Sequence, residues 1–258
     1  MGKKSSKLAK QSKAEQARLA EQARKAEEEE AKQEQQRELE KKEEQKAAES
    51  KETKEDAPKK MTAKIGIVYY SMYGHVLSLA ETMRDVFEEQ GCEVLLMQVP
   101  ETLPEEVLKK MGAPPKADHP IATPQDLASC DGLMFGIPTR FGMAAAQMKT
   151  FMDSTGQLWG EQALSGIPAG VFFATGTQGG GQETTALTFV TQLTHHGMIF
   201  VPLGYSSELQ KDMKEIHGGS PYGAGTYGIE NTPTELEKEI AAAQAERMAS
   251  IVKRLAGV

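Results

Sequence analysis

Cysteines and long apolar runs are scarce in this chain of 258 residues. Its two cysteines, Cys92 and Cys130, are too few for a disulfide framework or a thiolate zinc site, and no metal site is expected. No apolar run approaches the roughly 20 residues that a membrane-spanning helix needs. The N-terminus also lacks the apolar core of a secretory signal peptide. Together these absences predict a cytoplasmic protein in a reducing compartment.

Aromatic residues are absent from residues 1–60, which contain three leucines, 17 basic residues and 15 acidic residues. This segment cannot bury enough apolar area to form a core. Residues 61–258 can form one domain of ordinary size. They carry 13 basic and 22 acidic residues, and a net charge of −9 would repel nucleic-acid phosphates. We therefore expect a charged tail, residues 1–60, followed by a single domain, residues 61–258, that binds no nucleic acid.

The tail is composed mainly of helix-forming residues. Ala, Glu, Gln, Lys and Arg dominate residues 13–49, and pairs such as Glu21 with Lys25 have the favourable acid-first spacing of four. No apolar heptad is sustained, so we expect a solvated helix, with a coiled coil as the alternative. Residues 50–61, which include Pro58, are expected to form a flexible linker.

The first six residues match the N-myristoylation pattern, in which Gly2 is followed by Ser6. A single acyl chain binds membranes only marginally and needs a second signal. A polybasic segment can supply that signal, and the lysines available are Lys3, Lys4, Lys7, Lys10 and Lys13. One hypothesis is therefore peripheral attachment to the anionic, cytoplasmic face of a membrane. The alternative is a solubilising basic terminus with a chance motif match.

The domain alternates between short apolar runs and amphipathic segments. Runs suited to buried parallel strands occupy residues 65–70, 94–99, 132–137, 169–174 and 198–201. Helices are predicted over residues 75–90, 143–154, 183–195 and 233–255. This alternation predicts an α/β fold with a doubly wound, five-stranded parallel sheet. Ligands bind beyond the carboxyl ends of the strands in such sheets, so the loops there are the candidate site.

The first of these loops, residues 71–76, joins the first strand to its helix. It consists of Ser71, Met72, Tyr73, Gly74, His75 and Val76. A hydroxyl, a permissive glycine and the free N–H groups of a helix start can cradle a phosphate. The loop has neither the G-x-G-x-x-G pattern of dinucleotide-binding folds nor a Walker lysine. The alternative interpretation is an ordinary strand–helix turn.

Two more loops follow the third and fourth strands. They span residues 138–142 and 175–182, and the latter has three consecutive glycines that allow close backbone approach to a flat ligand. Phe141 and Trp159 are candidate aromatic walls, although core packing is the favoured interpretation of Trp159 on composition alone. The three loops together suit a planar, phosphate-bearing redox cofactor, and FMN fits them better than NAD.

Six motifs occur in order along the domain. They are Tyr69–His75 (YYSMYGH), Pro138–Gly142 (PTRFG), Thr175–Thr177, Gly179–Glu183, His195–Met198 and Gly218–Ala224. In these motifs the sequence resembles the WrbA family, flavodoxin-like FMN-dependent NAD(P)H:quinone oxidoreductases of type IV. The resemblance covers nearly all of residues 62–258 and does not extend to the tail.

The resemblance implies a position for FMN. The phosphate would contact the loop of residues 71–76, and the ring would contact Thr139, Arg140 and Phe141. The ribityl chain and ring edge would lie along Ala174, Thr175, Gly176, Thr177, Gln178, Gly179 and Gly180. The glycine-rich loop is one residue longer than is usual in the family, which leaves the contact at Gln178 open.

The resemblance also implies where NADH or NADPH and the quinone bind. Tyr73 would contact the nicotinamide, and Trp159 would cover the place where nicotinamide or quinone stacks. His195 would reach the flavin from a neighbouring subunit of a homotetramer. From the sequence alone, His195 beside His196 could equally cap carbonyl groups at a helix end.

The expected function is a two-electron reduction of quinones by NAD(P)H, with hydride transfer in a ping-pong sequence. One alternative is a single-electron shuttle of the flavodoxin type. Another is a membrane-recruited flavoprotein with a scaffold or adhesion-related role. Residues 227–231 lack the arginine that is common in the family, and His217 stands where an arginine is frequent. The resemblance therefore does not indicate which nicotinamide is preferred.

Overall fold

The computed structural model describes residues 62–228 and 233–258. These described residues belong to one compact unit. The helix predicted over residues 13–49 and the linker predicted over residues 50–61 lie outside the described residues, so both stay predictions.

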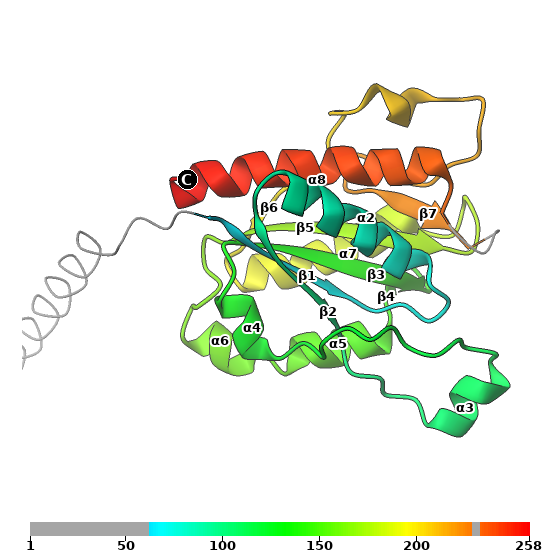
Figure 1. Ribbon diagram of the computed structural model, residues 1–258. Helices are drawn as coiled ribbons and strands as arrows, with labels where there is room; N and C mark the ends of the chain where they lie inside the picture. The colour runs from blue at the N-terminus through cyan, green and yellow to red at the C-terminus, as the bar shows by residue number, and fades with distance from the viewer. Residues whose placement is uncertain (1–61, 229–232) are drawn as a thin grey trace, which may run out of the picture. The chain divides into compact units, whose positions relative to one another are not determined.

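A parallel sheet forms the centre of the domain (Figure 1). Its five principal strands are β1 (Lys64–Tyr69), β2 (Glu93–Gln98), β3 (Gly132–Arg140), β5 (Pro168–Thr175) and β6 (Ile199–Phe200). They lie in the order β2-β1-β3-β5-β6, and every neighbouring pair is parallel. This confirms the predicted five-stranded parallel sheet. The chain leaves β1 for β2 on one side and returns to β3 on the other, which opens a crevice at the carboxyl ends of β1 and β3.

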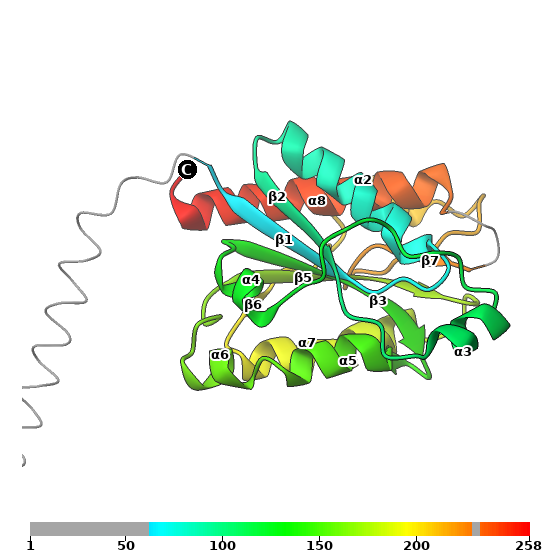
Figure 2. The same cartoon turned by 60° about the horizontal axis from the view of Figure 1, so that its bottom comes forward.

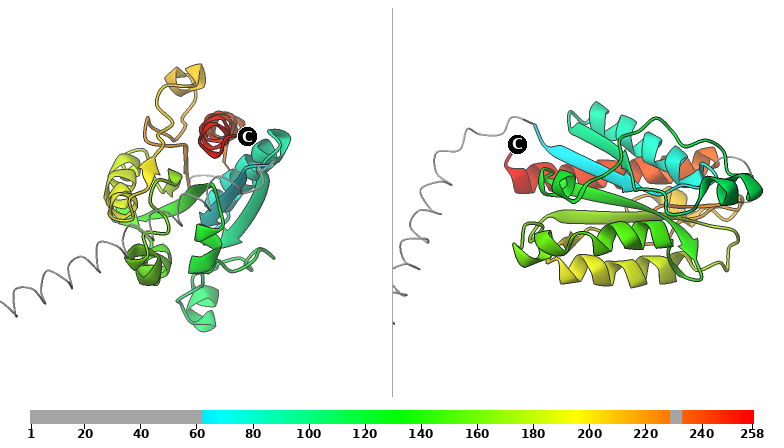
Figure 3. Two further views of the ribbon diagram at one scale, coloured as in Figure 1. Left: turned by 90° about the vertical axis from the view of Figure 1, so that its left-hand side faces the viewer. Right: turned by 90° about the horizontal axis from the view of Figure 1, so that it is seen from below.

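Helices cover both faces of the sheet. On one face, α2 (His75–Glu89) packs beside α8 (Glu235–Ala256), and on the other face lie α5 (Ala146–Asp153) and α7 (Gln182–His195), as Figures 2 and 3 show. The predicted apolar face of α2 is confirmed, and its buried residues are Val76, Leu79, Ala80, Met83 and Phe87. The parallel strands are therefore covered on both sides, which explains their nearly continuous apolar sequences.

Each face of the sheet has its own buried cluster. Phe172 belongs to the cluster under α2 and α8, whereas Phe135 and Phe173 belong to the cluster under α5 and α7. Adjacent residues of β5 thus enter opposite cores, because side chains alternate along a strand. The rings of Phe135 and Phe189 meet at a centroid distance of 5.3 Å and join β3 to α7.

Several short elements were not predicted. These are α3 (Glu105–Lys110), α4 (Pro124–Ala128), α6 (Gly156–Gly160), the 3₁₀ helix η1 (Glu208–Lys211) and the strands β4 (Met143–Ala144) and β7 (Gly225–Tyr227). They are too short to show a periodic pattern. Because β4 pairs antiparallel with β3, the helix predicted over residues 143–154 begins only at Ala146. No helix in the described part of the chain is long and apolar enough to cross a membrane.

Candidate functional site

A cavity of about 660 Å³ lies where β1, β3 and β5 end. All three predicted loops reach it. The predicted site residues that line it are Ser71, Met72, Tyr73, His75, Val76, Thr139, Arg140, Ala174, Thr175 and Gly176. The predicted convergence of the three loops is therefore seen in the structure, and the volume of the cavity is in the range of small-molecule sites.

The first loop forms an open cradle for an anion. Gly74 adopts the left-handed backbone conformation, with φ +92°, and precedes the first turn of α2. Its N–H donates to Ser71 Oγ at 3.1 Å. None of the described residues accepts a hydrogen bond from the backbone N–H groups of Met72, Tyr73 or Val76, and the first turn of α2 has no acidic side chain. Unpaired N–H groups at the positive end of a helix dipole suit a phosphate group.

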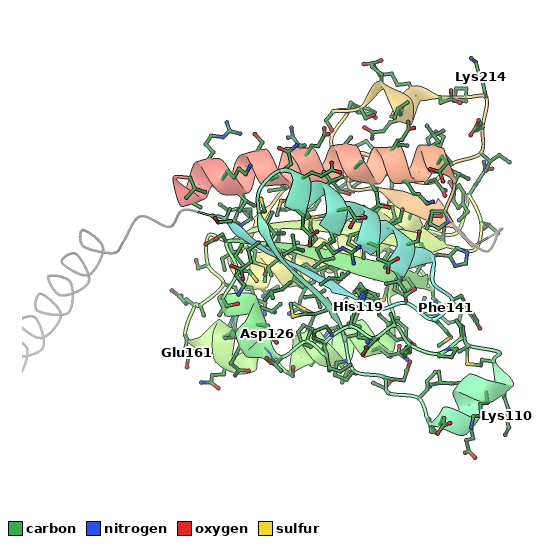
Figure 4. The ribbon with its side chains drawn as sticks, viewed as in Figure 1. Lys110, His119, Asp126, Phe141, Glu161 and Lys214 are labelled. Atoms are coloured by element: carbon green, nitrogen blue, oxygen red, sulfur yellow. The ribbon has the colours of Figure 1, made fainter. Side chains whose placement is uncertain are left out.

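The second loop is tied to the start of α7 by hydroxyl groups. Thr185 Oγ1 donates to the carbonyl of Gly181 at 2.8 Å, so it accepts from Thr139 Oγ1 at 2.9 Å. Phe141 does not line the cavity. Its ring is fully exposed and its φ is +53°, a conformation that is uncommon for a bulky residue. Figure 4 labels Phe141 at the end of the domain where β3 finishes.

The glycine-rich loop brings fewer residues to the cavity than predicted. Thr175 Oγ1 donates to the carbonyl of Thr177 at 2.9 Å, and the N–H of Gly180 donates to the same carbonyl at 3.0 Å. This tight turn follows Gly176 directly. The predicted residues of this loop that do not line the cavity are Thr177, Gln178, Gly179 and Gly180.

Gln182 and β7 bring an unpredicted glycine to the cavity. Gln182 Nε2 donates to Thr175 Oγ1 at 3.2 Å and to the carbonyl of Thr226 at 3.1 Å. The N–H of Gly228 donates to the carbonyl of Thr175 at 2.7 Å, and Gly228 lines the cavity. Two segments far apart in the sequence therefore share one wall, which a local pattern could not indicate.

The connection between β2 and β3 supplies a further unpredicted wall. Gly112 and Pro114 follow α3 and line the cavity. Tyr73 Oη donates to the carbonyl of Met111 at 3.3 Å, which ties the first loop to this connection. Glycine and prolines after residue 111 indicate a turn, but nothing in the sequence places that turn over the first loop.

Trp159 and His195 lie elsewhere in the same chain. They line a second cavity of about 320 Å³ together with His196. Trp159 is 61% exposed, so the interpretation of Trp159 as a core residue is wrong. The His195 side chain makes no hydrogen bond with any other described residue, so the structure gives no support to a capping role. Glu161, just beyond α6, and Phe141 are labelled at opposite ends of the domain in Figure 4.

Ionisable groups near the first cavity do not form a metal site. No group of three or more His, Cys, Asp or Glu side chains in the described ranges is arranged to hold a metal ion. The Arg140 guanidinium donates from Nη1 to the carbonyl of Thr139 at 2.8 Å and lines the cavity. Burial and the hydrogen bond to Glu101 raise the pKa of Tyr70, so this phenol stays neutral beside the first loop. The described lining of the site therefore offers backbone dipoles, hydroxyls, the guanidinium of Arg140 and the imidazole of His75.

Comparisons with known proteins place the chain in a family. The family model described as NADPH-dependent FMN reductase matches residues 63–210. The chain is 56% identical over 200 residues to Quinone-oxidoreductase QR2 of Triphysaria versicolor, covering 76% of this chain and 98% of that protein. It is 50% identical over 199 residues to NAD(P)H quinone oxidoreductase PST3 of Candida albicans, covering 75% of this chain and all of that protein.

The fold has a counterpart among solved structures. A WrbA-like flavodoxin from Agrobacterium tumefaciens superposes with a TM-score of 0.54 at 20% identity, over 75% of this chain and 99% of the other. The fold is therefore flavodoxin-like. The chain belongs to the NADPH-dependent FMN reductase family, and the resemblance to WrbA in the sequence is confirmed.

Proposed function

We propose that this protein binds FMN in the first cavity and catalyses the two-electron reduction of quinones by NADH or NADPH. The observation that carries the proposal is the open N-terminus of α2 at the base of that cavity, with Gly74 at φ +92° and the N–H groups of Met72, Tyr73 and Val76 without acceptors among the described residues. Relatives at 50–56% identity, named as quinone oxidoreductases, support it.

The cradle fits a mononucleotide. It is a single anion site at a single helix start, and the cavity of about 660 Å³ is large enough for one planar ring system with its side chain. An added Cβ at Gly74 or Gly176 would meet no other atom within 4 Å, so these two glycines border open space that a ligand can fill. When bound, FMN supplies a ring that accepts a hydride and passes it on.

In this proposal the protein's own groups bind FMN and orient the substrates. Backbone N–H groups of the first loop would hold the phosphate, and residues of the second loop and the glycine-rich loop would hold the ring. Arg140 lines the cavity, and among the described residues it donates only to the carbonyl of Thr139, so its other donors can stabilise negative charge there. Tyr73, which is 47% exposed, presents its ring at the rim where the nicotinamide binds. Because nicotinamide and quinone use the same place in turn, the kinetics are ping-pong.

The place where these substrates stack is completed by another copy of the chain. Trp159 and His195 are exposed, and they lie apart from the first cavity in their own chain. An exposed tryptophan is typical of a contact surface. We propose a homotetramer in which Trp159 and His195 of one copy cover the first cavity of another.

The tail directs this enzyme to a membrane. Gly2 and Ser6 fit the acylation pattern, and the first five lysines add roughly 1 kcal/mol each near an anionic surface. The proposal places a cytoplasmic enzyme partly at the cytoplasmic face of a membrane. It depends on Met1 being the initiator residue.

Spectroscopy and turnover test the proposed function together. The purified full-length protein is expected to be yellow, to release FMN rather than FAD on denaturation, and to lose its visible absorbance when NADH or NADPH is added. Benzoquinone should restore that absorbance. A flavin that is reduced one electron at a time and never by NAD(P)H indicates a shuttle instead. A flavin-free protein with intact fold supports the scaffold role and refutes the enzyme.

A further inference from the structure

Lys116 approaches the first loop from the connection between β2 and β3. Its Nζ donates to the backbone carbonyl of Ser71 at 3.1 Å and pairs with Glu101 Oε2 at 2.9 Å. The same Nζ lies 4.4 Å from the centroid of the Tyr70 ring. One cation therefore contacts three groups around the point where β1 ends and the anion cradle begins.

The segment that carries Lys116 is anchored to the edge of the sheet. Gln98 Nε2 donates to the carbonyl of Ala117 at 2.7 Å and to that of His119 at 2.8 Å. Tyr69 Oη and His119 Nδ1 are 2.8 Å apart, which ties the segment to β1 as well. Figure 4 labels His119 beside the sheet. Side chains from β1 and β2 therefore hold the segment next to Lys116. This fixes the position from which the Lys116 side chain reaches Ser71.

Glu101 is the fixed counter-charge of Lys116. Burial alone would raise the pKa of this carboxyl, but hydrogen bonds from Lys116, Gln147, Leu103 and Tyr70 outweigh burial and lower it to about 2. Gln147 Nε2 donates to Oε1 at 2.8 Å, and Tyr70 Oη donates to Oε2 at 2.8 Å. Glu101 is therefore ionised at every physiological pH and holds the ammonium group of Lys116 next to Ser71.

The bond from Lys116 to Ser71 constrains the next N–H group. In a trans peptide the C=O of one residue and the N–H of the next point in opposite directions. The Ser71 carbonyl points to Lys116, so the Met72 N–H points away from it. That N–H has no acceptor among the described residues, and Met72 lines the cavity. Holding this carbonyl therefore orients one donor of the cradle.

We propose that Lys116 is a positioning residue, which sets the Ser71–Met72 peptide for phosphate binding and so makes the site prefer phosphorylated flavin to riboflavin. This inference rests on the proposed function of the same cavity. Nothing in the sequence connects Lys116 with the first loop, 45 positions earlier, and none of the predicted site residues is a lysine.

Comparing the affinities for FMN and riboflavin distinguishes a positioning role of Lys116 from a general disruption of the cavity. Flavin-free full-length protein is titrated with FMN and with riboflavin, which lacks the phosphate. Lys116→Met is expected to raise the Kd for FMN about tenfold, as the loss of a charge-assisted hydrogen bond predicts, and to change the Kd for riboflavin less than about twofold. Lys116→Arg should bind FMN as the wild type does. Lys149→Met, which removes an exposed lysine paired with Asp153, is the matched control and should change neither value.

A double variant distinguishes loss of the Lys116–Ser71 hydrogen bond from repulsion of the phosphate by the Glu101 carboxylate. Lys116→Met also leaves the Glu101 carboxylate without its partner, and this charge could repel the phosphate on its own. In Glu101→Gln/Lys116→Met that repulsion is gone but the Ser71 carbonyl is still free. Weak FMN binding by the double variant supports positioning, whereas recovery of wild-type affinity overturns it.

Two further outcomes overturn the inference and leave the proposed function standing. One is an unchanged Kd for FMN in Lys116→Met. The other is an equal loss for FMN and riboflavin, which assigns Lys116 to the shape of the whole cavity. If the wild-type protein binds neither flavin, the proposed function fails and this inference with it.

Discussion

His196 shows how one buried side chain acquires a defined protonation state. Thr155 Oγ1 donates to the carbonyl of Met152 at 2.6 Å, so it accepts from His196 Nε2 at 2.8 Å. His196 Nδ1 is buried and is without a hydrogen-bond partner among the described residues. Burial, with a smaller contribution from the charge of His195, lowers the pKa of His196. The ring is therefore neutral in the native domain, and a proton on Nδ1 would be a buried, unpaired charge.

This arrangement makes stability depend on pH. The unfolded chain binds a proton on His196 near the ordinary pKa of about 6.5, whereas the folded chain binds it only at lower pH. The unfolded state thus holds more protons between these two values, and the free energy of unfolding falls as the pH falls below about 6.5. Urea denaturation at pH 7.5, 6.5 and 5.5 should show a smaller decrease for His196→Gln than for the wild type. Equal slopes would mean that His196 does not titrate differently in the two states.

At the scale of elements, one buried carboxylate joins β7 to the start of α8. Glu237 is 2% exposed, and Oε1 accepts from the backbone N–H of Gly218 at 2.8 Å. Oε2 accepts from Thr226 Oγ1 at 2.7 Å and from the backbone N–H of Thr234 at 3.0 Å. Thr234 Oγ1 in turn accepts from the backbone N–H of Glu237, which completes a capping box. A single side chain thus fixes the helix start and the segment that leads to Gly228.

Glu237→Gln replaces one oxygen atom by an NH₂ group, yet it should strongly destabilise the domain. Both carboxylate oxygens face backbone N–H donors, so either orientation of the amide places its NH₂ group against a donor. We expect a loss of roughly 2–3 kcal/mol in the free energy of unfolding, measured with urea. Glu239→Gln, an exposed position two residues along α8, is the matched control and should change stability by less than about 0.5 kcal/mol. Similar values for the two variants would contradict the bridging role of Glu237.

At the scale of the whole molecule, the proposed site needs more than one copy of the chain. Trp159→Ala should therefore raise the apparent KM for quinone, by about threefold to tenfold for a lost aromatic stacking contact, while the FMN content stays unchanged. The free energy of unfolding of the domain should change little, because Trp159 is exposed.

Mixing two defective variants tests whether Trp159 acts across copies. Gly74→Val places a branched side chain at φ +92°, which strains the cradle, and leaves Trp159 intact. Dissociating and reassembling Gly74→Val with Trp159→Ala should produce some sites with an intact cradle and an intact tryptophan. Turnover at low quinone concentration should then exceed that of either variant alone. No gain after proven subunit exchange would assign Trp159 to a site within its own chain.

The tail adds a prediction about the full-length protein. Four tails on the proposed tetramer would gain avidity, while lysines alone are screened within about 8 Å at physiological salt. Wild-type protein is expected to partition partly with membranes, more at low salt than at high salt, and residues 61–258 alone should stay in solution with full activity. Gly2→Ala and a triple change of Lys3, Lys4 and Lys7 to Gln should each reduce the membrane fraction. Identical partitioning of all these proteins would exclude the anchor.

The sequence by itself determined the sheet and most of the cradle. Period-two and period-3.6 patterns identify strands and helices because burial imposes them locally, and the carboxyl ends of parallel strands meet at one edge. The sequence therefore assigns residues 71–73, 75–76, 138–140 and 174–176 to one site, and all of them line the first cavity. Each of these segments lies directly after, or at, the end of a predicted strand.

The tertiary structure decided what long loops bring to that edge. Gly112, Pro114 and Lys116 reach the first loop because the β2–β3 connection returns to Gln98 at the end of β2. Gly228 reaches Thr175 because β7 pairs with the end of β5. Because the chain turns at Thr177, residues Thr177–Gly180 likewise do not line the cavity. Such contacts depend on loop closure over tens of residues, and the sequence signals only that a turn occurs, not where its residues come to lie.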